Sequence, residues 1–296
     1  MKKILVTGGA GFVGSHLIPL LLENGYMVTA VVKAEEVSRI NDKRIKVITG
    51  DLSEKSDWVR KIGGYDTLIH LAAQISSKSP DEFKKNNVVA TRNLIEAAKK
   101  EKIKRIILFS SAAVTSSRQD PYSKTKMEQE VIVKHSGIDF IIIRPSMIYG
   151  PGDTKNMGWL ISFVKKYPII PLPGGGHFGR QPVFVEDLCE IVVKVLKTNI
   201  KDKTYEIHGY EYVPMRKMIA VIIKNLKSKR IIVYVPISVL KLVFWLGQFL
   251  IPNPKFTLDQ IESVVSGEKF HGDNWWQTFD IKPTEFDEGI SQMMAN

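Results

Sequence analysis

Short runs of aliphatic and β-branched residues alternate with segments of helical periodicity through the first half of the chain. The expected strands cover residues 4–7, 28–32, 45–49, 67–70, 105–109 and 140–143. The expected helices lie between them, near residues 12–24, 54–62, 83–101 and 121–136. Such alternation is typical of a parallel sheet with helices on both faces. We therefore predict an α/β fold that is built on a doubly wound parallel sheet.

The second half of the chain follows a different pattern. Residues 150–182 are rich in glycine and proline, which predicts loops. The helices expected after them lie near residues 186–197, 214–226, 236–250 and 257–264, and the short strands near residues 204–208 and 231–234. This change of pattern predicts a separate, smaller carboxyl-terminal region.

A glycine-rich loop directly follows the first expected strand. Gly8, Gly11 and Gly14 fall at GxxGxxG spacing between a strand and a helix. In that context the glycines allow a tight turn, a close approach of the backbone to a pyrophosphate and close packing of the new helix. Phe12 and Val13 open this helix, whose amino terminus attracts phosphate. The loop therefore predicts a bound dinucleotide and a sheet of the Rossmann type.

Two domains follow from these patterns. Residues 1–150 are expected to form the dinucleotide-binding Rossmann domain. Residues 151–296 are expected to form mostly a substrate-binding subdomain, with some segments returning to the Rossmann sheet. Ligands of doubly wound sheets bind at the carboxyl edge of the strands, so the smaller region is expected to close over that edge.

The residue at the end of the second expected strand bears on the choice of cofactor. A basic residue there accommodates the 2′-phosphate of NADP, whereas an acidic residue holds the ribose of NAD. Lys33 therefore favours NADP(H), while Glu35 and Glu36 keep NAD(H) open. Asp51 follows the third strand, where it is placed to accept a hydrogen bond from adenine or to cap a helix.

A serine, a tyrosine and a lysine form the candidate catalytic set. Ser111 follows the fifth expected strand, and Tyr122 and Lys126 lie one helical turn apart on a shared face. A nearby ammonium favours the phenolate, so we expect Lys126 to lower the pKa of Tyr122. Tyr122 would then serve as the acid and base of an alcohol–ketone interconversion. Ser111 is expected to hydrogen-bond the reacting oxygen, and Lys126 also to bind the nicotinamide ribose.

Together these motifs resemble the extended short-chain dehydrogenases/reductases of the NAD-dependent epimerase/dehydratase family. The resemblance covers nearly the whole chain and also rests on residues 51–52, 70–73, 87–88, 110–111, 144–152 and 182–187. It implies that Ser111, Tyr122 and Lys126 are catalytic. It implies further cofactor contacts from a set of seven residues: Leu52, Leu71, Ala72, Ala73, Asn87, Pro145 and Ile148.

Two features depart from the family pattern. Residues 114–116 read Val-Thr-Ser where the family often has Val-Tyr-Gly, and the connection from Ser111 to Tyr122 is shorter than is usual in sugar epimerases. Short connections resemble atypical members, one of which serves as an accessory subunit of respiratory complex I. The resemblance therefore does not define the part of the substrate-binding wall that this connection forms.

The expected function is that of an NAD(P)-dependent oxidoreductase acting on a nucleotide-activated sugar by hydride transfer at C4. Reduction of a 4-keto-sugar is favoured over 4-epimerisation because Lys33 favours NADPH, the usual biosynthetic reductant. Ser111, Tyr122 and Arg180 are expected to contact the substrate, with Arg180 on its phosphate. One alternative is a hydroxysteroid or small-carbonyl dehydrogenase, suggested by the apolar residues of segment 236–250. Another is an assembly subunit that retains the nucleotide without catalysis.

The composition of the chain excludes several other classes of protein and of binding site. Apolar residues make up 44% and charged residues 25% of the 296 residues, which is close to an average globular protein. The single cysteine, Cys189, excludes an internal disulfide and a cysteine-rich zinc site, and fits a cytoplasmic location. The six histidines form no close-spaced pair, so no metal site is expected.

The longest apolar stretches and the net charge indicate which kinds of partner the protein could have. Residues 4–22 are too polar at their centre, and residues 242–254 too few, to span a bilayer, so no integral membrane segment is expected. Segment 236–250 could instead face the core, a partner in a homodimer or a membrane surface. The net charge of +11 comes from dispersed lysines, which we interpret as a solvated surface rather than a nucleic-acid site. A phosphorylated small molecule would also fit this charge.

Overall fold

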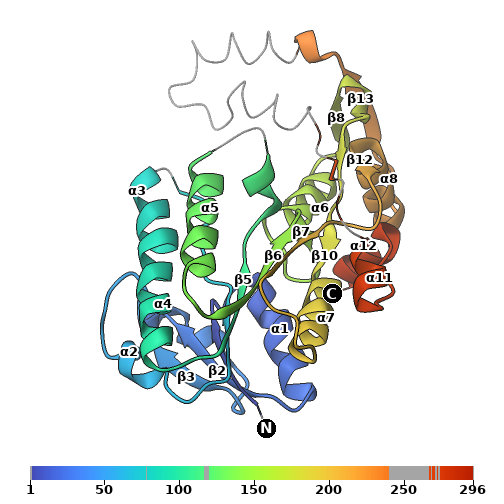
Figure 1. Cartoon of the computed structure of the whole chain (residues 1–296). Coiled ribbons are helices and arrows are strands. Elements are labelled where there is room, and N and C mark those ends of the chain that lie inside the picture. Colours follow the sequence, from blue (N-terminus) through green and yellow to red (C-terminus); the bar gives the residue numbers. More distant parts are fainter. Residues whose placement is uncertain are drawn as a thin grey trace. The chain divides into compact units, whose positions relative to one another are not determined.

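A computed structural model describes residues 2–77, 79–116, 120–239, 267, 269–270, 272 and 274–295. The chain divides into two compact units, and each is discontinuous in sequence (Figure 1). The sheet unit consists of Met1–Ser146, Val185–Ile207 and Asp273–Lys282. The second unit consists of Met147–Phe184, His208–Gly272 and Pro283–Asn296.

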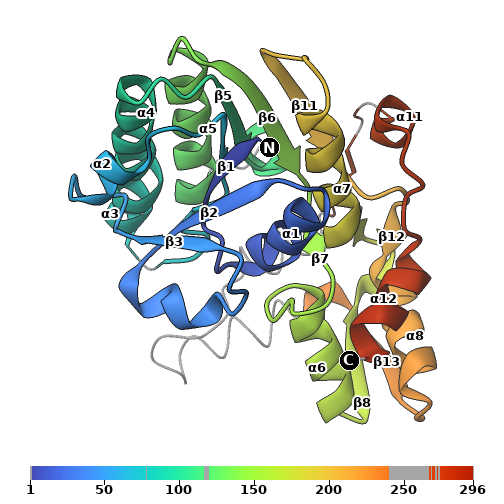
Figure 2. The ribbon, with the colours of Figure 1, turned by 90° about the horizontal axis from the view of Figure 1, so that it is seen from below.

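Seven parallel strands form the central sheet of the sheet unit, in the order β11-β6-β5-β4-β1-β2-β3 (Figure 2). Their bounds are β1 Lys3–Thr7, β2 Met27–Val32, β3 Lys46–Thr49, β4 Thr67–His70, β5 Arg105–Phe109, β6 Asp139–Pro145 and β11 Lys203–Ile207. The predicted doubly wound α/β fold is thus confirmed. The strand order reverses between β1 and β4, and in such sheets ligands bind beyond the carboxyl ends of the strands at that point.

Helices cover both faces of this sheet, with α4 and α5 on one face and α1 and α7 on the other (Figure 2). The α-helices of the unit are α1 Phe12–Glu23, α2 Trp58–Lys61, α3 Pro80–Phe83, α4 Ala90–Lys100, α5 Pro121–Lys134, α7 Val185–Leu196 and α11 Trp275–Phe279. Three shorter turns complete it: the 3₁₀ turns η1 Ala34–Arg39 and η3 Ala112–Thr115, and the π-helical turn η2 Lys84–Val89.

The inner strands are aliphatic throughout because both of their faces are buried. Residues 106–108 of β5 and 141–143 of β6 are fully buried. Side chains of one face, such as Leu5 and Leu68, pack in a core cluster with Leu94 of α4 and Val133 of α5. This two-sided burial explains why continuous aliphatic runs located the strands to within two residues.

Among the described residues of the second unit are three short strand pairs and three helices. The pairs are β7 Ile148–Tyr149 with β10 Val183–Phe184, β9 Gly179–Arg180 with β12 Val213–Pro214, and β8 Ile169–Pro173 with β13 Ile231–Val235. The helices are α6 Met157–Lys166, α8 Met215–Leu226 and α12 Phe286–Ala295, and η4 Gly174–Gly176 is a 3₁₀ turn. A separate hydrophobic cluster, which includes Leu160, Ile170 and Ile222, forms the core of this unit.

The prediction that residues 150–182 form loops is wrong, because α6 and β8 lie within them. Asp153 starts α6 by accepting a hydrogen bond from the Met157 N–H at 2.8 Å. The helix then buries Leu160, Ile161 and Val164 on one face. Gly158 lies within α6, and Pro171 and Pro173 lie within β8, but both elements keep their pattern of buried apolar residues. The predicted helix 257–264 and residues 240–250 of the predicted helix 236–250 lie outside the described residues.

Candidate active site

The turn from β1 into α1 depends on two glycines. Gly8 has a φ of +70°, and a Cβ there would lie 2.7 Å from the Ala72 backbone nitrogen. A Cβ on Gly14 would lie 2.5 Å from the Gly9 carbonyl oxygen. The Gly11 N–H closes the turn by donating to the Gly8 carbonyl at 3.0 Å. The loop is therefore fixed beside the segment that follows β4, at the point where the strand order reverses.

The amino terminus of α1 has the properties of an anion site. Its capping residue is Gly11, no side chain caps it, and its first turn contains no acidic residue. The positive end of the helix dipole therefore meets no carboxylate of its own turn. The dinucleotide predicted on Gly8, Gly11, Phe12, Val13 and Gly14 fits this arrangement, since its diphosphate would meet backbone N–H groups there.

Lys33 and Asp51 form an ion pair beyond the ends of β2 and β3. The Lys33 Nζ lies 3.2 Å from the Asp51 Oδ2, and the Asp51 Oδ1 accepts from the Ser53 N–H at 2.8 Å. Burial raises the pKa of Asp51, but the hydrogen bonds from Ser53 and the charge of Lys33 outweigh it, so this pKa lies below its usual range. Leu52 packs into the core, and its carbonyl accepts from Asn93 at 3.0 Å. Its cofactor contact stays a prediction.

Beyond β4 the chain is held against β1 by Thr7 and His70. The His70 Nδ1 lies 2.7 Å from the Thr7 hydroxyl, and its Nε2 lies 2.9 Å from the Thr91 hydroxyl. Burial, and then the charge of Lys126, lower the pKa of His70 to about 3. This imidazole is therefore neutral and structural. The Leu71 N–H donates to the Thr7 carbonyl at 3.1 Å, which places residues 71–73 beside the glycine loop.

Asn87 connects this segment with α5. It lies in the π-helical turn η2, a type of turn that is frequent at functional sites, and it is fully buried. Its Oδ1 accepts from the Gln74 N–H at 2.7 Å, and its Nδ2 donates to the Gln74 carbonyl at 3.1 Å and to the Thr125 hydroxyl at 3.0 Å. Asn87 thus fixes the turn after β4 to the helix that carries Tyr122 and Lys126.

The start of α5 is fixed by a cap and a proline. The Asp120 carboxylate accepts from the Ser123 N–H at 2.7 Å, and Pro121 occupies the first helical position. Lys126 lies one turn after Tyr122 on this helix. It is fully buried, and its Nζ donates to the Phe109 carbonyl at 2.6 Å. Because Phe109 ends β5, this bond ties α5 to the strand that leads into Ser110 and Ser111.

Ser111 and Tyr122 lie near each other in the sheet unit, and their catalytic roles stay predictions. Ser111 caps η3 by accepting from the Ala113 N–H at 3.2 Å. Burial raises the pKa of Tyr122 above 10.0, the Ser111 side chain lowers it, and the charge of Asp120 raises it again. The phenol of Tyr122 is therefore protonated at neutral pH.

The prediction that Lys126 lowers the pKa of Tyr122 is wrong for this structure. The lysine is itself buried, which lowers its pKa to about 7 against the opposing charge of Glu130. It is thus only partly charged at neutral pH, and its Nζ is bound to the Phe109 carbonyl. The largest effect on the pKa of Tyr122 is instead the burial of its own phenol, which raises that pKa.

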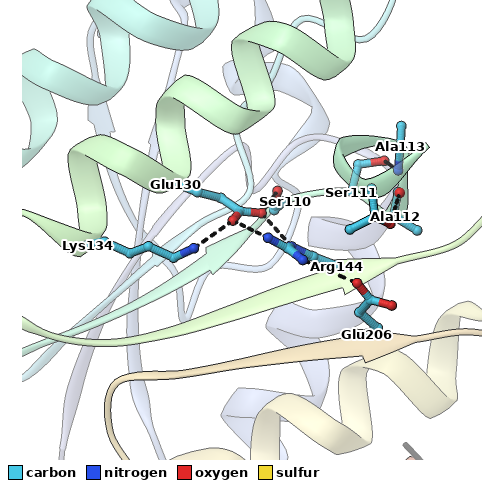
Figure 3. A network of polar contacts seen from close by, with 9 residues as sticks. Ser110, Ser111, Ala112, Ala113, Glu130, Lys134, Arg144 and Glu206 are labelled. Atoms are coloured by element: carbon cyan, nitrogen blue, oxygen red, sulfur yellow. Dashed lines mark hydrogen bonds and ion pairs between the residues drawn. The ribbon is translucent and has the colours of Figure 1, made fainter. Parts of the chain in front are cut away.

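A buried charge network lies behind the two serines, and the sequence analysis missed it (Figure 3). Glu130 accepts from the Ser110 hydroxyl at 2.6 Å, from the Arg144 Nε at 2.8 Å and from an Arg144 terminal nitrogen at 2.7 Å. Lys134 adds an ion pair to Glu130 at 3.2 Å, and Arg144 also contacts Glu206 at 3.2 Å. The network joins α5, β5, β6 and β11, and Glu130 follows Lys126 at the same spacing at which Lys126 follows Tyr122.

The remaining predicted residues are divided between the units. Pro145 is buried at the end of β6 in the sheet unit. Ile148 lies in β7 and Arg180 in β9, both in the second unit. Their roles at the nicotinamide and the substrate phosphate stay predictions. Within the described part of the chain, no three histidine, cysteine or carboxylate side chains gather as a metal site would need.

Comparison with known proteins gives several matches. A model described as the NAD dependent epimerase/dehydratase family matches residues 4–207. Ceramide reductase of Caulobacter vibrioides is 31% identical over 170 residues, which cover 57% of this chain and 53% of that protein. UDP-glucose 4-epimerase of Vibrio cholerae is 29% identical over 220 residues, which cover 65% and 66%.

The solved structure of UDP-glucose 4-epimerase from Thermotoga maritima with UDP-glucose has a TM-score of 0.78 at 19% identity, over 99% of this chain and 97% of that chain. At that identity the likeness shows the fold. The chain spans about half the length of the ceramide reductase that it matches. The family match runs from β1 to the end of β11, so it includes the glycine loop, Ser111, Tyr122 and Lys126.

Proposed function

Because the chain belongs to the NAD-dependent epimerase/dehydratase family, as its motifs predicted, we propose that it interconverts a secondary alcohol and a ketone with Ser111, Tyr122 and Lys126 as catalytic residues. The observation that carries this proposal is the bond from the Lys126 Nζ to the Phe109 carbonyl at 2.6 Å, which holds the start of α5, with Tyr122 one turn before Lys126, against the strand that leads into Ser111. That set lies in the same sheet unit as a glycine loop suited to a dinucleotide.

The cofactor would be held by the loop from Gly8 to Gly14, by Lys33 and Asp51 on the adenosine side, and by the segment 71–73. A nicotinamide dinucleotide bound there supplies or takes up the hydride. Tyr122 donates its proton to the oxygen of the ketone as that oxygen gains negative charge. Ser111 hydrogen-bonds the same oxygen and positions it, and Lys126 holds the end of β5 and contributes positive charge.

We propose reduction as the main direction on the basis of Lys33, which follows β2. Lys33 can contact a 2′-phosphate, which favours NADPH, the usual biosynthetic reductant. Tyr122, which is protonated at neutral pH, would then donate its proton to the ketone.

The substrate that we propose is a nucleotide-activated 4-keto-sugar, with Arg180 on its phosphate. Support comes from the family match and from the Vibrio cholerae relative, which is named a UDP-glucose 4-epimerase. A second candidate is a lipophilic ketone, which the ceramide reductase relative favours. The two differ in pocket chemistry, since a sugar needs several hydrogen-bonding side chains and a lipid needs an apolar wall.

Turnover of NADPH with a nucleotide-4-keto-sugar and with long-chain ketones tests both candidates. We expect oxidation of NADPH with the sugar, and we expect Tyr122→Phe to lower kcat at least about 1000-fold while the dissociation constant for NADPH changes less than about threefold. Tyr65→Phe, which alters a tyrosine bonded to Thr29 within the sheet unit, is the matched control. Turnover of long-chain ketones alone would replace the sugar by the lipid class. Undiminished turnover in Tyr122→Phe would overturn the catalytic assignment.

A further inference from the structure

One face of the second unit is apolar and exposed to solvent. In the parallel pair of β8 and β13, Ile231 lies opposite Ile169 and Val233 lies opposite Pro171. Ile169 is 54% exposed, Ile231 65% and Val233 43%, whereas Ile170, next along β8, is fully buried. Side chains alternate between the faces of a strand, so the inner face of β8 packs into the core and the outer face of the pair is aliphatic and open, while Tyr234 of β13 is exposed as well.

A row of aromatic side chains leads into this face along α6. Trp159 stacks on Phe163 with ring centroids 5.5 Å apart, and Phe163 lies 4.9 Å from Tyr167. Trp159 is 52% exposed, and Tyr167, also exposed, precedes β8 by two residues. Tryptophan and tyrosine are enriched where apolar and aqueous phases meet, because each ring has an apolar body and a polar group.

Arg230 holds the aromatic row and the sheet face together. Its Nε donates to the Val164 carbonyl at 2.8 Å, and a terminal nitrogen donates to the Lys165 carbonyl at 2.9 Å. These carbonyls belong to the last turn of α6, and Arg230 directly precedes β13. Figure 2 shows α6, β8 and β13 side by side. We call the outer surface of α6, β8 and β13 the apolar face.

The two segments that build this face lack acidic residues. Residues 154–184 and 212–239 contain ten lysines and arginines and no aspartate or glutamate. Lys165, Lys166 and Lys229 are exposed at the border of the apolar face. Glu211, just before the second segment, is paired with Lys217. The elements that carry the apolar face therefore contribute lysines and arginines but no carboxylate from within these two segments.

We propose that the apolar face docks on the surface of an anionic lipid bilayer. Exposed aliphatic and aromatic side chains gain by leaving water for the acyl boundary, and the lysines around them gain by approaching lipid phosphates. A second copy of this chain is a poor occupant, because two such faces would bring like charges together. A nucleic acid would use the lysines but leave the isoleucines without a partner. This proposal does not depend on the proposed reaction.

Vesicle co-sedimentation of the whole protein, without substrate or cofactor, tests the proposal. We expect binding to vesicles of phosphatidylcholine with phosphatidylglycerol, and weaker binding to phosphatidylcholine alone. The pair Ile169→Thr and Ile231→Thr keeps β-branched residues in the strands, and should lower binding to the mixed vesicles about tenfold. The pair Lys165→Gln and Lys166→Gln should lower it about tenfold as well, and added salt should weaken only the charge contribution.

Matched controls come from the sheet unit. Val131→Thr replaces an equally exposed aliphatic residue, and the pair Lys99→Gln and Lys100→Gln removes two exposed lysines from the last turn of α4. These controls should bind vesicles as the unaltered protein does, and all variants should keep its NADPH affinity. Absence of vesicle binding, equal loss in the controls, or binding of an oligonucleotide in place of vesicles would overturn the proposal. A dimer that the apolar-face variants dissociate would also overturn it, in favour of self-association.

Discussion

Burial of Lys126, a residue of the proposed catalytic set, affects the stability of the fold. Burial lowers its pKa from 10.5 to about 7, so the folded protein binds its proton less tightly than the unfolded chain does. As the pH falls from 10.5 to 7, the unfolded chain takes up a proton that the folded protein resists, and stability is lost through that window. The loss amounts to about 1.4 kcal/mol for each pH unit. A lysine that holds the end of β5 therefore weakens the fold at neutral pH.

We expect Lys126→Met to abolish turnover and to stabilise the protein near neutral pH relative to alkaline pH. Loss of the bond to the Phe109 carbonyl costs about 1–3 kcal/mol at every pH, whereas relief of the proton linkage applies only below the unfolded pKa. The free energy of unfolding of the variant, relative to the unaltered protein, should thus rise as the pH falls from about 9 to about 7. Urea titrations at both values measure it. An identical difference at both would show that Lys126 is not held with a lowered pKa.

The proposed preference for NADPH also rests on one residue, Lys33. We expect Lys33→Asp to weaken NADPH binding by about tenfold or more, because a carboxylate repels the 2′-phosphate, and to strengthen NADH binding. Fluorescence titration with each cofactor measures the change. Lys46→Asp makes the same change of charge at the amino end of β3 and should leave both affinities as they are. Equal effects on NADPH and NADH would remove Lys33 from the 2′-phosphate site.

At the scale of elements, the strands and the helix α5 were predictable, and the polar contacts that hold them together were not. Strands of the sheet are buried on both faces, so their aliphatic runs can be recognised in a single sequence. The glycine loop is recognised by its spacing between a strand and a helix. The π-helical turn that carries Asn87 has no comparable signal, because its residues 84–89 read as ordinary helix. The network of Glu130 and Arg144 depends on pairing between elements that are distant in sequence. The sequence indicated this network only through Arg144, a charged residue within the buried strand β6.

We expect Glu130→Gln to destabilise the protein by about 3 kcal/mol, because Arg144, Lys134 and Ser110 would lose the carboxylate that pairs with them. Glu206→Gln serves as the control, since Glu206 contacts Arg144 only once and is more exposed, and it should cost about 1 kcal/mol or less. Urea unfolding compares the two. Equal costs would mean that burial of Glu130 does not set the strength of the network.

At the scale of the whole molecule, the two compact units do not follow a single boundary in the sequence. A sequence boundary near residue 150 separates the glycine loop and catalytic set from the rest, but the sheet unit also needs residues 185–207. Within that segment α7 packs on α1, and β11 pairs in parallel with β6. Part of the sheet therefore comes from chain that returns after the first half of the second unit. No helix within the described residues combines the length and the apolar character needed to cross a bilayer.

We accordingly expect a fragment of residues 1–150 not to fold on its own. Without α7 the apolar face of α1 would be exposed, and without β11 the edge of β6 would be unpaired. Thermal melting followed by circular dichroism should show no cooperative transition for the fragment and a clear one for the whole chain. A cooperative transition at the same temperature in both would show that the first half is an independent domain.

The ion pair of Lys33 and Asp51 implies that the 2′-phosphate that we propose for this position would meet a lysine already engaged. Selection there would then be a competition between two anions, in which the phosphate takes the place of the Asp51 carboxylate on Lys33. Salt weakens both the contact of Lys33 with Asp51 and its contact with the phosphate. The ratio of the two cofactor affinities should for that reason drift little between dilute and concentrated buffer, even where each affinity declines.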